Sequence, residues 1–169
     1  LKSMNRPYSA ERFREVVESL AGGVKDISIG ADVIVGFPGE SKADFIETFN
    51  MIEALPLAYL HVFPYSERSG TEAATMSGQV DARIIKERAK RLRMLGEQKC
   101  LEFYGKFIDK KVEVLVESGR NEKSGLLKGR TNNYIPILID GGDELKGTIV
   151  KVLLRGDELS LEGMRGVVV

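Results

Sequence analysis

Two segments, each with the pattern of a buried strand that ends in a turn, most constrain the fold of this 169-residue chain. The first segment runs from Ala31 to Glu40 and the second from His61 to Ala74, and one helix-length stretch lies between them. A strand, a helix and a second strand in this order predict a right-handed crossover between two parallel strands. Both turns would then lie at one rim of the sheet, which is where α/β proteins bind their ligands.

The residues around these segments predict further helices. Ser9 is a good N-cap for a first helix, Ser41 begins a stretch that resembles the capping box of a second, and Asp81 can cap a long third one. The apolar run that includes Ala31 is nearly continuous, which is typical of a strand buried on both faces. The predicted elements are helices over 10–20, 42–55 and 82–107 and strands over 27–35 and 57–63.

From about residue 110 the apolar residues change from helical spacing to alternation. Short strands between Gly-rich turns predict a small closed barrel. The strands are expected at 112–117, 134–139, 148–154 and 158–162. The chain therefore divides into an α/β part over residues 1–104 and an all-β part over 105–169. Two parallel strands are too few for a complete α/β domain, so we expect further strands to precede residue 1.

Composition narrows the classes of function. The chain has 25 basic and 25 acidic side chains, so no whole-molecule field attracts nucleic acid, although a local patch remains possible. The single cysteine, Cys100, excludes internal disulfides and any metal or iron–sulfur site held by several thiolates of this chain, and it indicates a reducing, cytoplasmic location. The sequence contains no apolar run of about 18 residues, so it predicts no membrane span. The absence of Met at position 1 hints at a fragment.

Gly36, Phe37, Pro38 and Gly39 form the first strand-end turn, and glycines there let the backbone approach a ligand closely. A tight turn without a ligand is the alternative. The roles of two strand residues stay open. His61 is either a hydrogen-bonded core residue or an acid–base group. Asp32 either reaches a partner such as His61 or Arg6, or faces a ligand in the lumen of a barrel.

In the all-β part, cations, amides and an aromatic residue gather at the mouth of a strand and in the preceding loop. They are Arg120, Lys123, Lys128, Arg130, Asn132, Asn133 and Tyr134. Cations contact phosphates and an aromatic ring can stack on a base, so these residues predict RNA binding, with a polar hairpin loop as the alternative.

These motifs resemble a known family. The stretch 32–40, the strand 61–66, the tail 70–74 and the opening 4–8 are similar to the radical S-adenosylmethionine methylthiotransferases, and the stretch 129–134 is similar to their TRAM RNA-binding module. The resemblance implies the carboxyl-terminal part of a partial (β/α) radical SAM barrel with parallel strands, followed by a small OB-like TRAM barrel. The form of the strand 61–66 is most similar to the branch that modifies N6-threonylcarbamoyladenosine at position 37 of tRNA.

The same resemblance implies S-adenosylmethionine as cofactor and the tRNA anticodon arm as partner. The residues that it places beside the cofactor are Gly36, Phe37, Pro38, Gly39, Phe63, Pro64 and Tyr65. The intact enzymes carry two four-iron four-sulfur clusters, but this chain lacks their cysteines, so we expect it to bind no cluster, to hold no metal or catalytic residue of its own and to be inactive alone. The alternatives are a stand-alone RNA-binding module, or a methylthiotransferase acting on isopentenyladenosine tRNA or ribosomal protein S12. A homo-oligomer through the exposed sheet edge also remains possible.

Overall fold

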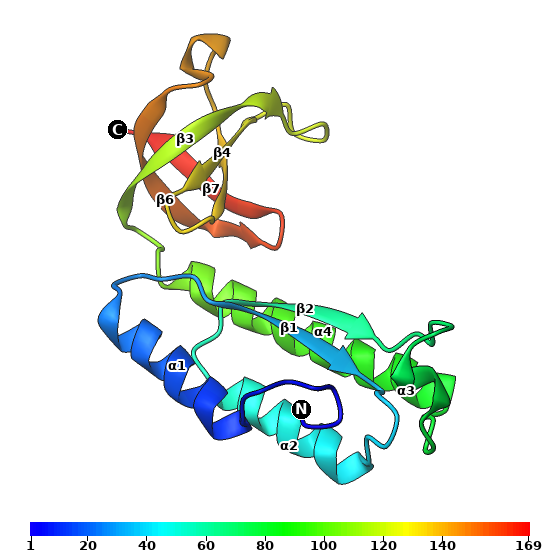
Figure 1. Cartoon of the computed structure of the whole chain (residues 1–169). Helices are drawn as coiled ribbons and strands as arrows, with labels where there is room; N and C mark the ends of the chain where they lie inside the picture. Colours follow the sequence, from blue (N-terminus) through cyan, green and yellow to red (C-terminus); the bar gives the residue numbers. More distant parts are fainter. The chain divides into compact units, whose positions relative to one another are not determined.

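A computed structural model describes residues 1–169, except for the side chains of Asp157 and Glu158. The chain forms two compact units, 1–99 and 100–169, and the last helix of the first unit continues into the second. The first unit contains α1 (Ala10–Gly23), β1 (Gly30–Val35), α2 (Lys42–Ala54), β2 (Tyr59–Pro64), α3 (Glu72–Thr75) and most of α4 (Ala82–Gly105). The second contains β3 (Lys111–Arg120), β4 (Leu127–Thr131), β5 (Pro136–Ile139), the short 3-10 helix η1 (Asp143–Leu145), β6 (Ile149–Ser160) and β7 (Gly163–Val168) (Figure 1).

The predicted helix starts are confirmed. The Ser9 hydroxyl accepts a hydrogen bond from the backbone N–H of Arg12, 3.2 Å away, at the start of α1. At the start of α2, Ser41 and Asp44 exchange the two bonds of a capping box. The Asp81 carboxylate accepts a bond from the backbone N–H in the first turn of α4. These caps satisfy backbone donors that a helix start otherwise leaves unpaired.

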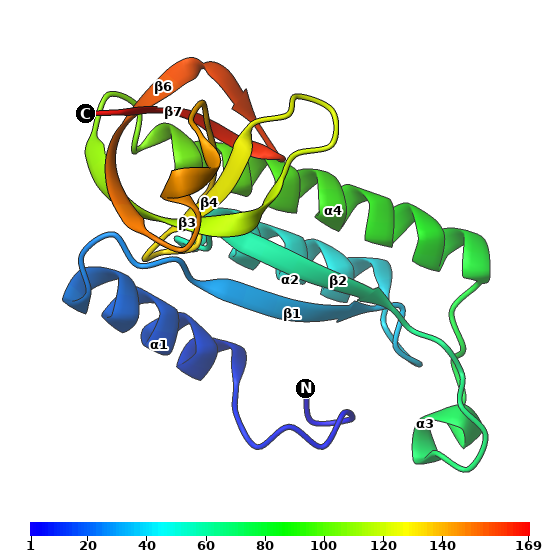
Figure 2. The same ribbon diagram turned by 90° about the horizontal axis from the view of Figure 1, so that it is seen from above.

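β1 and β2 pair in parallel, as the strand–helix–strand order predicts. One face of this pair packs on the three long helices through a core that includes Val17 of α1, Val35 of β1, Phe45 of α2 and Leu92 of α4 (Figures 1 and 2). The prediction that β1 is buried on both faces is wrong, because its burial alternates. Ile34 and Phe63, which are cross-strand partners on the other face, are 39% and 50% exposed. This second face, called the open face below, consists of Gly30, Asp32, Ile34, Tyr59, His61 and Phe63.

The second unit is a closed barrel in the order β3-β4-β5-β7-β6. All neighbouring strands are antiparallel except β5 and β7, which are parallel. Its interior is filled by aliphatic side chains that are at most 1% exposed. They are Val114, Val116, Leu127, Ile135, Ile137, Ile139, Val152, Leu154 and Met164. The prediction of a barrel is thus confirmed, but β4 and β7 were not predicted, and the break expected between the strands 148–154 and 158–162 is absent because β6 continues to Ser160.

Candidate functional site

The turn at the end of β1 is held by hydrogen bonds between backbone groups. Gly36 and Gly39 have φ angles of +80° and +86°, which glycine adopts at little cost. The N–H of Glu40 donates to the carbonyl of Phe37 over 2.9 Å, and the N–H of Gly39 donates to the carbonyl of Gly78 over 2.8 Å. The turn is therefore tied to the segment that leads into α4.

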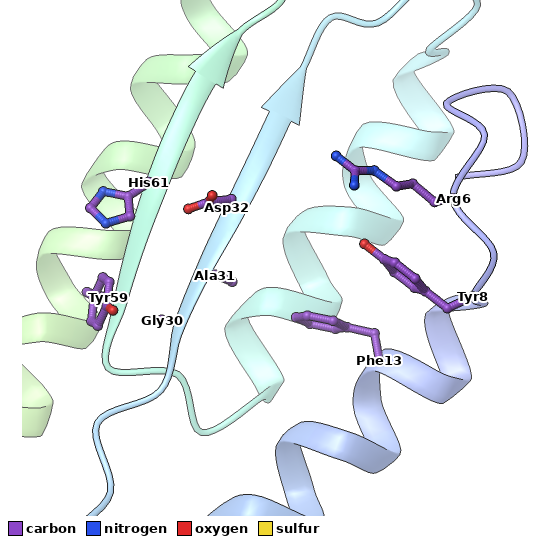
Figure 3. Close-up of a pocket in the computed structure, with 8 residues that line it drawn as sticks. All are labelled: Arg6, Tyr8, Phe13, Gly30, Ala31, Asp32, Tyr59 and His61. Carbon is purple, nitrogen blue, oxygen red and sulfur yellow. The ribbon is translucent and has the colours of Figure 1, made fainter.

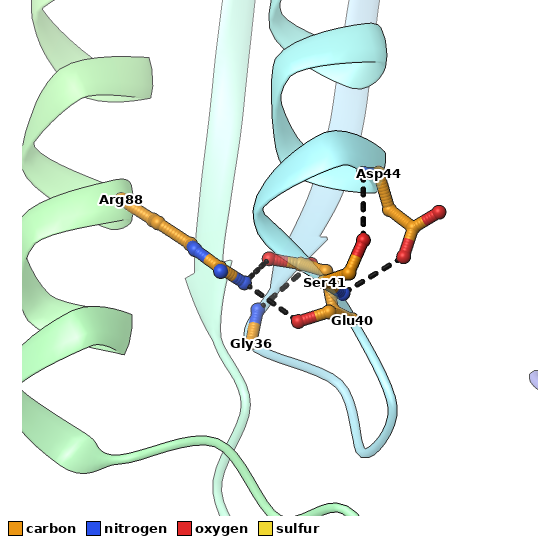
Figure 4. Close-up of polar contacts among 5 residues, drawn as sticks. All are labelled: Gly36, Glu40, Ser41, Asp44 and Arg88. Atoms are coloured by element: carbon orange, nitrogen blue, oxygen red, sulfur yellow. Dashed lines mark hydrogen bonds and ion pairs between the residues drawn. The ribbon is translucent and has the colours of Figure 1, made fainter.

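Contacts of the Glu40 side chain also hold this turn. One carboxylate oxygen of Glu40 accepts a hydrogen bond from the N–H of Gly36 over 2.9 Å, and the other accepts one from Arg88 of α4 (Figure 4). Arg88 also donates to the Glu40 carbonyl over 3.0 Å, and it is only 8% exposed. A Cβ on Gly36 would lie 2.4 Å from Cγ1 of Ile85, so α4 approaches this turn too closely for any other residue. Sequence reasoning missed Arg88, which is separated from Glu40 by most of the α/β unit.

The end of β2 lies beside this turn. The N–H of Tyr65 donates to the carbonyl of Val35 over 2.8 Å, and the Tyr65 ring meets the Phe37 ring edge to face, with centroids 5.6 Å apart. The Tyr65 hydroxyl is buried and has no hydrogen-bond partner among the described residues. A buried hydroxyl without a partner is costly, so it is a place where a polar ligand atom would be stabilising. The structure therefore brings Phe37 and Tyr65 together, while Phe63 and Pro64, the last two residues of β2, are exposed.

The open face carries polar groups further down the strands. Asp32 and His61 are cross-strand partners, and the His61 ring meets the Tyr59 ring edge to face, with centroids 5.3 Å apart. Both Asp32 and His61 are exposed, so neither is the buried strand residue that the sequence suggested. A cavity of about 440 Å³ lies against this part of the sheet.

In the barrel, most of the residues expected to bind RNA lie on β4 and the hairpin after it, whereas Arg120 ends β3 and Lys123 lies in the loop before β4. Lys128 and Arg130 point outward from β4, whose burial alternates. Nε of Arg130 lies 2.8 Å from a carboxylate oxygen of Glu117 on β3. The hairpin loop after β4 ends in Tyr134, which is 72% exposed and has a φ of +66°. Such a φ is unusual for a bulky residue and holds this aromatic ring out from the barrel.

Hydrogen bonds of the Thr131 hydroxyl also hold this hairpin loop. The Thr131 hydroxyl donates to Oδ1 of Asn133 over 2.5 Å and accepts a bond from the N–H of Ile135 over 2.9 Å. Asn132, between them, is exposed. Lys128, Arg130, Asn132, Asn133 and Tyr134 therefore follow one another along β4 and its hairpin, and we call them the β4 strip.

The other two cations, Arg120 at the end of β3 and Lys123 in the loop before β4, make their contacts within the barrel. The Arg120 guanidinium donates to the carbonyls of Gly125 and Gly141 over 2.8 and 3.0 Å, and to Asp143 over 2.6 Å. Nζ of Lys123 lies 2.6 Å from a carboxylate oxygen of Glu162, and this contact raises the pKa of Lys123. Arg120 thus joins the loop before β4 to the segment after β5. Both cations already have partners within the barrel, although Arg120 lies beside Leu127, next to Lys128 of the β4 strip.

Among the described residues, no three His, Cys, Asp or Glu side chains gather as a metal site requires. In the same part of the chain no helix has both the length and the apolarity to cross a bilayer.

The fold and these sites define a two-part α/β protein that ends in a small closed barrel. No protein-family profile matches the chain. Curated relatives do: the threonylcarbamoyladenosine tRNA methylthiotransferase MtaB of Bacillus subtilis is 38% identical over 154 residues, which are 90% of this chain and 34% of the relative. The MtaB protein of Aquifex aeolicus is 41% identical over 154 residues, 91% of this chain and 36% of the relative.

A tRNA-2-methylthio-N(6)-dimethylallyladenosine synthase, that of Thermobifida fusca, is 40% identical over 147 residues, 84% of this chain and 30% of the relative. The chain belongs to the radical S-adenosylmethionine methylthiotransferase family that its motifs resemble. It spans about a third of the length of these curated relatives.

Proposed function

We propose that this chain is the carboxyl-terminal portion of a tRNA methylthiotransferase that modifies C2 of N6-threonylcarbamoyladenosine at position 37. The relatives named for tRNA methylthiolation support the reaction class. These relatives include both threonylcarbamoyladenosine and dimethylallyladenosine enzymes. The choice of substrate therefore rests on the strand 61–66, whose form is most similar to the threonylcarbamoyladenosine branch. The observation that carries the proposal is the meeting of the two strand-end turns at the Tyr65 hydroxyl, which is buried without a hydrogen-bond partner in the described part of the chain.

The residues at this rim fit S-adenosylmethionine. The exposed backbone at Gly39 has open space where a Cβ would lie, Phe63 offers a half-exposed ring, and the Tyr65 hydroxyl lacks a partner among the described residues. We assign the adenosine end of the cofactor to Gly36, Phe37, Pro38, Gly39, Phe63, Pro64 and Tyr65. When bound, S-adenosylmethionine supplies the methyl group and the hydrogen-abstracting radical that the resemblance implies. The chain's own residues would orient it, because Glu40 and Arg88 hold the turn in one conformation.

The residues present do not fit the two iron–sulfur clusters. A four-iron cluster is held by several thiolates, and this chain has one cysteine, which lies on α4. The clusters would therefore belong to the remainder of a longer protein, and we expect the 169-residue chain to be inactive by itself.

For the two parts of the chain we propose the end of a radical SAM barrel over 1–104 and an OB-like TRAM module over 105–169. The β4 strip would contact the phosphates and bases of the tRNA anticodon arm in the cytoplasm. β1 and β2 pair only with each other in the described sheet, so each leaves one edge free. Further strands of the same protein would cover an edge, and a second copy of the chain is the alternative occupant.

A stand-alone RNA-binding module is the alternative from a different class. Mass spectrometry of tRNA nucleosides from a strain that lacks the gene separates the two. We expect the methylthio form of threonylcarbamoyladenosine to disappear and its precursor to accumulate. An unchanged nucleoside profile would reject the enzyme, whereas loss of methylthio-dimethylallyladenosine would change only the substrate.

A further inference from the structure

The cavity extends from the edge of β1 that is unpaired in the described sheet onto the open face, and it is lined by groups of opposite character. Arg6 and Tyr8 come from the segment before α1, Asp32 from β1, and Tyr59 and His61 from β2. Figure 3 shows Arg6 and Tyr8 on the side of β1 away from β2, with both side chains extending toward Asp32. One wall is apolar, formed by the Phe13 ring and the start of β1.

The polar groups of this cavity do not satisfy one another. Among the described residues, the side chains of Arg6, Tyr8, Asp32 and His61 form no hydrogen bond or ion pair with each other. A guanidinium and a carboxylate that face one cavity without pairing can each bind a complementary group of a ligand. The cavity therefore suits a ligand that carries both a carboxylate and hydrogen-bond donors.

We propose that this cavity receives the polar substituent on N6 of the substrate adenosine, with Arg6 binding its carboxylate and Asp32 accepting from its hydroxyl or urea N–H. This inference rests on the proposed function. A threonylcarbamoyl group has a carboxylate, a hydroxyl and a urea, whereas a dimethylallyl group is a hydrocarbon. Placing a hydrocarbon against Arg6 and Asp32 would remove water from both charges without replacing its hydrogen bonds.

The position along the strand agrees with this role. Asp32 precedes Gly36 by four residues, so the cavity lies about 13 Å down β1 from the cofactor turn. A purine held at the rim with an extended N6 substituent spans such a distance. Arg6 and Asp32 are then residues that select the substrate, and His61 lines the same cavity.

The test is an NMR titration of the ¹⁵N-labelled 169-residue chain with the free substituent, N-carbamoyl-L-threonine, and with dimethylallyl alcohol. We expect saturable shifts of the Arg6, Asp32 and His61 amides with N-carbamoyl-L-threonine at millimolar concentration, and no saturation with the alcohol. Arg6→Gln should weaken binding at least tenfold. Arg12→Gln is the matched control, because Arg12 lies exposed on α1 and pairs only with Glu15 among the described residues.

Three outcomes would overturn the inference: no saturable shift at these amides, equal binding of the alcohol, or unchanged binding by Arg6→Gln when its spectrum shows an intact fold. Sulfate is a further probe, and if it matches N-carbamoyl-L-threonine then the cavity is a simple anion site and the role of Asp32 is wrong. The tRNA nucleoside profile is measured separately. Saturable binding combined with an unchanged profile would keep the cavity as a ligand site but reject its assignment to a tRNA substrate.

Discussion

Arg88 donates hydrogen bonds to both the carboxylate and the backbone carbonyl of Glu40. The same carboxylate accepts a hydrogen bond from the N–H of Gly36. A helix in the second half of the α/β unit thereby fixes the turn at which its first strand ends. This ion pair is well shielded from water, since the two side chains are 10% and 16% exposed. Removing one partner of this pair should therefore lower the free energy of unfolding far more than removing a surface ion pair would.

The first prediction concerns this ion pair. Arg88→Met should lower the free energy of unfolding by about 3 kcal/mol, because it leaves the Glu40 carboxylate shielded from water and without its cation. Urea-induced unfolding measures the change. Arg83→Met is the control and should change stability by less than about 0.5 kcal/mol, because the Arg83 side chain is 93% exposed. Equal effects of the two variants would show that Arg88 does not stabilise the turn.

The second prediction concerns acid stability of the barrel. Hydrogen bonds from Lys146 and then Arg120 hold the pKa of Asp143 below its ordinary value of 3.8. In acid the unfolded chain therefore binds more protons than the folded one. This contribution to stability is complete above that value and is lost as pH falls through the lower pKa of the folded state.

Asp143→Asn should thus flatten the fall in thermal stability between about pH 5 and pH 2. The measurement is the melting temperature by circular dichroism across this range. Asp140→Asn makes the same charge change outside the cluster and should keep the wild-type slope. If both variants show the same slope, the Arg120–Asp143–Lys146 cluster does not cause the pH dependence.

The third prediction concerns Tyr134. Its positive φ is strained for a tyrosine, so Tyr134→Gly should leave barrel stability unchanged or raise it by up to about 1 kcal/mol. The same change should weaken tRNA binding about tenfold, because it removes a ring on which a base can stack. Filter binding measures the second effect. Tyr134→Phe keeps the ring and should bind as wild type, and a similar loss in both variants would exclude stacking.

The fourth prediction concerns the cations of the β4 strip. The double variant Lys128→Ala, Arg130→Ala should bind tRNA more weakly and lower the slope of log affinity against log salt by about one to two. Glu117→Gln should act in the opposite direction, because it frees Arg130 from its ion pair. Lys86→Ala, an exposed change on α4, is the control. An unchanged slope in the double variant would place the RNA site elsewhere.

Local signals predicted much of this fold. Ser9, Ser41 and Asp81 marked the starts of α1, α2 and α4, because a cap is recognised from residues close together in the sequence. The parallel pairing of β1 and β2 followed from the order of the elements. The buried contact between Arg88 and Glu40 carried no such signal, since nothing near either residue indicates that they meet.

The missed barrel strands have a physical explanation. On β4 and β7, glycines stand at inward positions where apolar side chains would otherwise reveal the alternation. A Cβ on Gly129 would lie 2.5 Å from Cγ1 of Val114, and one on Gly166 would lie 2.7 Å from Cγ2 of Ile137. The barrel is too narrow there for a side chain, so the alternation of apolar residues is interrupted in the sequence of both strands.

The strand order of the barrel also bears on how fast it forms. β3 closes the barrel by pairing with β6, so Lys111 finds Leu153 about 40 residues further along the chain, whereas α1, α2 and α4 each form from local contacts. Bringing such distant strands together costs chain entropy before any contact is gained. We therefore expect refolding of the isolated chain to show a fast helical phase and a slower one in which β3 and β6 close the barrel.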